Sequence, residues 1–252
     1  MKTPQNTKTL PLFTAGLGIL ALALRIALLA LGNDEKGLLI PGHPLDILVW
    51  IVTAIAVLPV LLCIRKPKGP YCFVPSAAAA FGSFALAGGI AVAVIFGWNP
   101  WSRLELVRDL CGLLAIPALM AEALRRYEGK QTFFLLHAPV CVYLTLYTVS
   151  HYQIWCSRPQ LQDWFFSMIG CLLLMLFAYY QTAFDVEMGK PRMQQAAGLA
   201  SVFFCTAAMA AGEEVPLYLG GAVWALTSLC SLTPAAHHTE NSITEPVQED
   251  AQ

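Results

Sequence analysis

Three charged residues near the start of one long apolar stretch have the types and spacing to form a polar site. Glu105, Arg108 and Asp109 stand at positions i, i+3 and i+4, so on a helix their side chains share one face. Charged groups at membrane depth are costly, and they face a bundle interior, pair with one another or mark a functional site. This face is therefore the first candidate for a binding site.

Two further charged residues lie at a similar depth in the preceding apolar stretches. Arg25 is six residues from the end of the first stretch, and Asp46 lies in the first helical turn of the second. At a rise of 1.5 Å per residue, Arg25 would be about 9 Å deep and Asp109 about 8 Å deep. Pairing of Arg25 with Asp46 or Asp109 fits two interpretations. One is a polar vestibule that opens outward, and the other, simpler one is a structural layer of ion pairs.

The fifth apolar stretch adds aromatic rings and a histidine at the same end. Tyr143, Tyr147 and His151 recur every four residues, so they lie on one helical face that climbs toward the outer surface. We predict an aromatic stripe from Tyr143 and Tyr147, with Trp155 and Trp164 at its outer end. A stripe of this kind more often packs helices together than lines the path of a ligand. Contact of the stripe with Arg108 would favour the ligand path instead.

The segment HYQIWCSRPQLQDWF, residues 151–165, connects two apolar stretches and concentrates polar and aromatic residues. Trp155 and Trp164 flank it and suit the headgroup level of a bilayer, because tryptophan has an apolar ring and a polar N–H. The segment is interpreted as the collar of a helical hairpin. It becomes part of the vestibule if His151 and Asp163 close over the charged start of the fourth stretch.

Composition places all of these residues in a membrane protein. The chain has 252 residues, of which 57% are hydrophobic and only 12% are charged, and its mean hydropathy is +0.61. Soluble domains carry about 25% charged residues, and apolar runs of about 20 residues are long enough to cross a bilayer. Such runs must be helices, because lipid offers the backbone no hydrogen-bond partner. We predict an all-α polytopic transmembrane bundle with the lipid bilayer as its surroundings and no nucleic-acid partner.

Eight spans are predicted, of which the fourth is the weakest because charged residues crowd its start. The predicted spans are residues 10–31, 44–64, 72–97, 104–124, 131–150, 164–184, 194–212 and 215–232. Together they form a single domain over residues 1–232. Residues 233–252 are polar and acidic without an apolar period, which predicts a disordered cytoplasmic tail.

Basic residues predict the orientation of the spans. Ten Lys and Arg residues fall at one set of span ends and three at the other. Short cytoplasmic loops carry the excess of Lys and Arg, so both termini are predicted to be cytoplasmic in a multi-pass protein of the cell membrane. On this topology Glu213 and Glu214 stand at a tight outer turn between the last two spans, where polar residues suit a turn.

The third predicted span is rich in small residues, SAAAAFGSFALAGGIAVAV. Ala, Gly and Ser let helix backbones approach closely, which takes the place of hydrophobic drive inside lipid. We therefore expect this span to be central in the bundle.

Signatures of catalysis or of metal binding are lacking in the sequence. It has no H-E-x-x-H, G-x-S-x-G or phosphate-binding loop motif and no C-x-x-C. Only Cys156 lies in a predicted outer loop, so no disulfide is expected. No cofactor and no metal site are predicted.

Three classes of function remain open. A non-enzymatic membrane module for binding, assembly or regulation is favoured by the short loops and the lack of catalytic motifs; its partner would be a membrane protein or a small solute. A small-solute transporter, or the solute-binding subunit of one, is favoured by the outer polar layer. A membrane-embedded enzyme would need acid and base groups that converge at one depth, and it ranks last.

Overall fold

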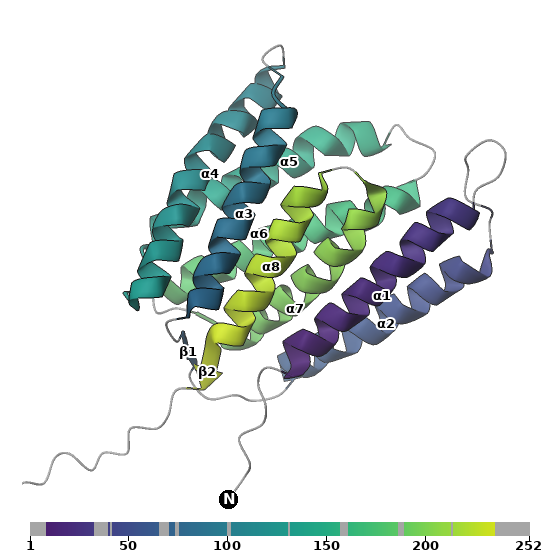
Figure 1. Ribbon diagram of the computed structural model, residues 1–252, viewed down its shortest axis with the longest axis horizontal. Coiled ribbons are helices and arrows are strands. Elements are labelled where there is room, and N and C mark those ends of the chain that lie inside the picture. Colours follow the sequence, from purple (N-terminus) through teal and green to yellow (C-terminus); the bar gives the residue numbers. More distant parts are fainter. Residues whose placement is uncertain are drawn as a thin grey trace, which may run out of the picture.

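The chain folds into a helical bundle with a very small β-ribbon at one end (Figure 1). This computed structural model describes residues 9–32, 40, 42–65, 71–73, 76–99, 102–130, 132–156, 161–185, 189–212 and 214–234. In chain order the elements are α1 (Thr9–Leu31), α2 (Pro44–Arg65), β1 (Tyr71–Phe73), α3 (Ala77–Phe96), α4 (Arg103–Glu128), η1 (Phe134–Leu136), α5 (Ala138–Cys156), α6 (Leu161–Asp185), α7 (Pro191–Ala208), η2 (Met209–Ala211), α8 (Val215–Ser231) and β2 (Leu232–Pro234).

Each predicted span contains one helix, and six of the helices are long and apolar enough to cross a membrane. These six are α1, α2, α3, α5, α6 and α7. Helix α8 is apolar but has only 17 residues, and α4 has an acidic residue in its first turn and basic residues in its last. The helical class is thus confirmed, together with six helices that could span a membrane.

A short β-ribbon corrects two predicted boundaries. Tyr71–Phe73 pairs antiparallel with Leu232–Pro234, so the third helix begins at Ala77 and not at residue 72. The side chain of Ser76 caps this helix by accepting a hydrogen bond from the Ala78 amide at 3.2 Å. The ribbon includes residues 233 and 234, which had been assigned to the tail; residues 235–252 lie outside the described residues. We call this end of the bundle the ribbon end, and the opposite end the hairpin end.

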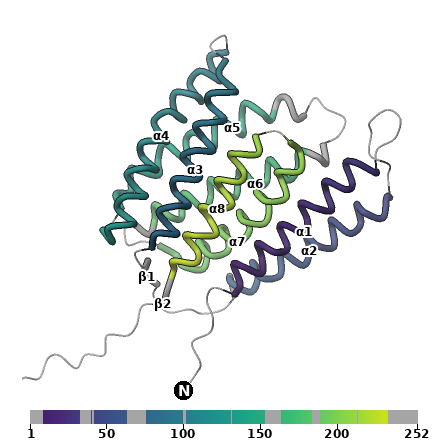
Figure 2. The backbone as a smooth tube through the Cα atoms, viewed as in Figure 1, coloured from purple at the N-terminus to yellow at the C-terminus, as the bar shows by residue number. Residues whose placement is uncertain are grey.

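Six of the helices form a closed ring. Helix α3 packs against α4, α4 against α5, α5 against α6, α6 against α7, α7 against α8, and α8 against α3. The α1–α2 hairpin lies outside this ring, against α7 (Figure 2). Side chains from several ring helices therefore point into one shared interior, which is where buried polar groups can find partners.

The closest helix–helix contact in the ring depends on glycines of α3 and α8. A Cβ on Gly89 would collide with the Pro216 carbonyl oxygen, and a Cβ on Gly220 would lie 2.5 Å from the Ala85 oxygen. The small residues of α3 thus do bring two backbones together, as predicted. Helix α7 is buried still more completely than α3, since it is buried without interruption from residue 196 to residue 208.

Substitution of Gly89 tests this contact. We expect Gly89→Leu to lower the free energy of unfolding by about 1–3 kcal/mol, because the new side chain meets backbone that cannot move aside. The measurement is the melting temperature and size-exclusion profile of the protein in detergent. The matched control is the adjacent Gly88→Leu, because Gly88 is exposed and a Cβ there meets nothing within 4 Å. Equal melting temperatures for the two variants would contradict the ring contact.

Candidate functional site

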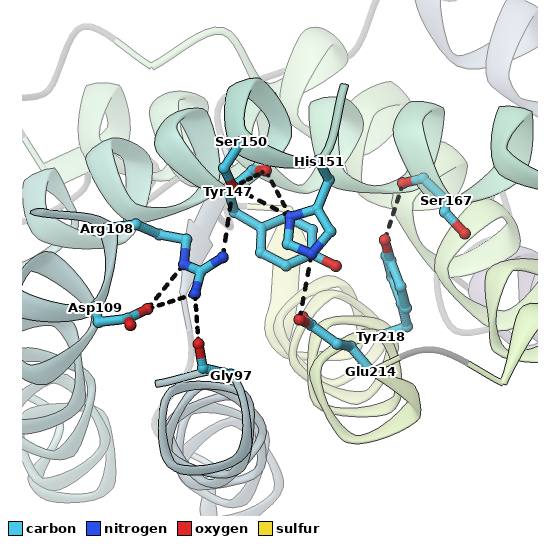
Figure 3. Close-up of polar contacts among 9 residues, drawn as sticks. All are labelled: Gly97, Arg108, Asp109, Tyr147, Ser150, His151, Ser167, Glu214 and Tyr218. Atoms are coloured by element: carbon cyan, nitrogen blue, oxygen red, sulfur yellow. Dashed lines mark hydrogen bonds and ion pairs between the residues drawn. The ribbon is translucent and has the colours of Figure 1, made fainter. Parts of the chain in front are cut away.

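The start of α4 places an ion pair inside the ring at the hairpin end. Asp109 is only 1% exposed, and its Oδ1 lies 2.8 Å from both Nε and Nη2 of Arg108. Arg108 also donates from Nη2 to the Gly97 carbonyl at 3.1 Å and from Nη1 to the Ser150 hydroxyl at 3.5 Å (Figure 3). The guanidinium thereby joins the end of α3, the start of α4 and the end of α5.

The last turns of α5 continue this network. Ser150 donates its hydroxyl to the Tyr147 carbonyl at 2.9 Å, and Nδ1 of His151 lies 3.0 Å from the same carbonyl oxygen. The rings of Tyr147 and His151 stack with centroids 4.0 Å apart. These contacts fix the imidazole so that its Nε2 points to α8, where it lies 3.5 Å from Oε1 of Glu214 (Figure 3).

The turn before α8 positions Glu214. Gly212 ends the preceding 3-10 turn with φ 74°, and Glu214 itself adopts φ 48°, a left-handed backbone that is uncommon for a residue other than glycine. The amides of Leu217 and Tyr218 both hydrogen-bond to the Glu214 carbonyl, at 3.0 and 3.4 Å, and so begin α8. This unusual backbone turns the Glu214 side chain inward to His151, although the sequence had indicated only a polar turn.

A cavity of about 360 Å³ lies beside this network. Residues 92–93 and 96–97 of α3 and its end form one wall, and residues 212 and 214–216 form the other. Among the described residues of the lining, Glu214 is the one that is ionisable, and Gly97 belongs both to the lining and to the Arg108 network. The described part of the lining is therefore apolar apart from this carboxylate.

The structure brings together three of the residues predicted for the vestibule. Arg108, Asp109 and His151 belong to one network, and Glu105 lies half-buried one turn before Asp109. The side chains of Asp163 and Trp155 lie outside the described residues, so their predicted places remain predictions.

Two predicted members belong to other parts of the bundle. Arg25 is buried on α1, where Nη1 donates to the Ala207 carbonyl at 2.6 Å and the guanidinium lies 4.4 Å from the centre of the Phe166 ring. Its predicted pairing with Asp109 was wrong, since Asp109 pairs with Arg108. Asp46 is half-buried in the first turn of α2, a helix that packs against α1 and α7 outside the ring.

The predicted aromatic stripe is formed in part. The rings of Tyr143 and Tyr147 are 6.2 Å apart and both are buried in the ring interior. Trp164 does not extend the stripe at the bundle surface, because its side chain is 7% exposed and belongs to the main hydrophobic core. Across the interior, Tyr218 of α8 donates its hydroxyl to the Ser167 carbonyl of α6 at 3.3 Å (Figure 3).

A second buried cluster of ionisable residues, Glu122, Arg126 and His137, lies near the ribbon end of the ring and was not among the predicted site residues. Glu122 and His137 are both 0% exposed, and Oε2 of Glu122 lies 3.5 Å from Nδ1 of His137. Arg126 places Nε 2.7 Å from Oε1 of Glu122 and donates from Nη1 to the Ser228 hydroxyl of α8 at 3.1 Å. The His137 ring also lies 6.2 Å from that of Trp224.

A signal for this cluster was present in the sequence. Glu122 and Arg126 stand four residues apart, the spacing at which helix side chains pair. Arg126 had been counted among the basic residues of a cytoplasmic loop because the span was predicted to end at residue 124. The helix continues to Glu128 and ends at Gly129, whose φ of 71° is left-handed, so Arg126 stays on the helix and turns inward.

The two clusters give the ring ionisable groups near both ends. Carboxylate, imidazole and guanidinium groups together can bind an ion or a polar solute and can exchange protons. Among the described residues, no three His, Cys, Asp or Glu side chains converge as metal ligands.

The chain matches no protein-family model, no curated protein and no solved structure. Its function is therefore argued from the two clusters and the cavity alone.

Removal of Glu122 tests whether the ribbon-end cluster is buried as described. We expect Glu122→Ala to lower the free energy of unfolding by about 3–5 kcal/mol, because Arg126 would keep a buried charge without its carboxylate. Thermal or denaturant unfolding in detergent measures this loss. Glu122→Leu combined with Arg126→Leu should regain part of it, since no unpaired charge then remains in that pair.

The matched control is Glu128→Ala on the same helix. Glu128 pairs with Lys130 at 2.6 Å, but both side chains are at least half exposed. The nearby ammonium group lowers the pKa of Glu128, and solvent screening keeps such pairs weak. We expect little change in stability for this variant; a loss equal to that of Glu122→Ala would show that Glu122 is not buried.

Proposed function

We propose that the chain is a non-enzymatic membrane module with eight spans that binds a small solute at its outer end. Six helices have the length and apolarity to cross a membrane. Adding α4 and α8 as spans makes four helical hairpins and leaves both termini on the side that carries most Lys and Arg residues. That side is the cytoplasm by the positive-inside rule, so the hairpin end would face outward, and the cell membrane is the proposed location.

Spanning by α4 is supported by the way its charges are satisfied. Arg108 and Asp109 neutralise each other, and Glu122 is paired with Arg126. Charged side chains inside membranes face the bundle interior and pair in this way. Helix α8 is about 26 Å long at 1.5 Å per residue, close to the thickness of a bilayer core.

The observation that carries the binding proposal is the cavity between α3 and the start of α8. Its volume of about 360 Å³ is at the small end of the range for ligand sites. The described lining residues are apolar except for Glu214, and that carboxylate is connected through His151 and Ser150 to Arg108. An apolar cavity with one fixed polar group is the usual form of a small-molecule site.

Filling the cavity tests this function. We expect purified protein to show a rise in melting temperature with at least one compound in a library of small polar metabolites. Val92→Trp should abolish that rise, because the indole would occupy the cavity that Val92 lines. The matched control is Ile95→Trp on the same helix, since Ile95 is 70% exposed. A response that survives Val92→Trp would rule out this cavity as the site.

A second candidate function is transport of the solute, and the ribbon-end cluster favours it. Ionisable residues within membrane spans mark ion and proton pathways, and Glu122 and His137 lie buried in the same ring as the cavity network.

Reconstituted vesicles distinguish a transporter from a binding module. For a ligand found in the thermal screen, transport predicts accumulation driven by a pH gradient and lost in Glu122→Gln. Binding of the ligand without its accumulation would exclude transport of that ligand and support a binding module.

A further inference from the structure

The Glu214 carboxylate is incompletely satisfied, although it borders a cavity. Its Oε1 lies 3.5 Å from His151, while Oε2 is shielded from solvent and has no hydrogen-bond partner among the residues that the structure describes. A shielded carboxylate oxygen without a donor is costly. Since the other described lining residues are apolar, a bound ligand can supply the missing donor.

Nδ1 of His151 lies 3.0 Å from the Tyr147 carbonyl oxygen, which can only accept, and 3.2 Å from the Ser150 hydroxyl. The tautomer with the proton on Nδ1 satisfies the contact with the carbonyl. In a neutral imidazole, Nε2 would then present a lone pair to the Glu214 carboxylate. Two acceptors facing each other repel, so the pair requires one positive charge nearby, either a proton shared by the two groups or a cation.

The charges around the cavity favour a cation in that role. Arg108 and Asp109 balance each other, so Glu214 leaves one negative charge in excess when His151 is neutral. From α4, Glu105 adds a further carboxylate, and the facing groups from α5 and α8 are the neutral hydroxyls of Tyr143, Tyr147 and Tyr218. Among the described groups, none but Arg108 and His151 can bring a positive charge to this network.

We propose that the cavity binds a small organic cation, an ammonium group on a compact apolar body, with Glu214 as its counter-ion. This inference rests on the proposed binding function and names the ligand class. The ammonium N–H groups supply the donor that Oε2 lacks, and the apolar body occupies the space beside residues 92–93 of α3. Phe96, which also lines the cavity, can contribute a cation–π contact.

The test compares three probes of similar shape on the full-length protein in detergent by isothermal titration calorimetry. The probes are benzylammonium, benzyl alcohol and benzoate, which differ in charge. We expect benzylammonium alone to bind, with at least a tenfold loss of affinity in Glu214→Gln.

Two control variants distinguish an error in the proposed ligand class from an error in the proposed binding site. Glu128→Gln removes an exposed carboxylate far from the cavity and should bind as wild type does, and Val92→Trp should bind none of the probes. Binding of benzoate or benzyl alcohol that Val92→Trp abolishes would overturn the cation inference and leave the proposed site standing. Benzylammonium binding that is unchanged in Glu214→Gln would also overturn the inference, and no binding by any probe would count against both proposals.

Discussion

The burial of charged side chains on α4 is the constraint on which the rest of this structure depends. Asp109 and Glu122 are both removed from solvent, and a carboxylate in that position is tolerated only beside a positive partner and hydrogen-bond donors. Arg108 and Arg126 supply the charge, and each donates a further hydrogen bond to a hydroxyl on another ring helix, Ser150 of α5 and Ser228 of α8. His137, just before α5, approaches the second carboxyl oxygen of Glu122. These partners are within reach only because α4 packs with the other five helices into a closed ring.

Ring closure in turn depends on small residues that let two helices approach closely. Helices α3 and α8 approach at Gly89 and Gly220, where any side chain would meet backbone. Inside lipid the hydrophobic effect does not drive helices together, so this close packing and the buried polar contacts hold the bundle. The same α3–α8 contact separates toward the hairpin end, where the cavity opens and Glu214 lines it. Fold and candidate site therefore share one interface.

The helices could be predicted from the sequence because each apolar run is long and the runs are separated by polar breaks. The shared face of Glu105, Arg108 and Asp109 could also be predicted, since i, i+3 and i+4 geometry is local. The partners of Arg25 could not, because they depend on which helices pack together: α1 lies against α7, outside the ring. Glu214 was missed because its inward direction follows from a left-handed backbone at that residue, which a non-glycine residue does not signal.

A double-mutant cycle between Arg126 on α4 and Ser228 on α8 tests the closed ring of helices most directly. These residues are 102 positions apart in the chain, yet their side chains meet at 3.1 Å across the ring interior. Unfolding free energies of wild type, Arg126→Met, Ser228→Ala and the double variant give the coupling energy. If the ring is closed, the coupling energy should be about 1.5–3 kcal/mol, as for a hydrogen bond to a charged group. Additive effects of the two substitutions, with no coupling, would contradict the closed ring.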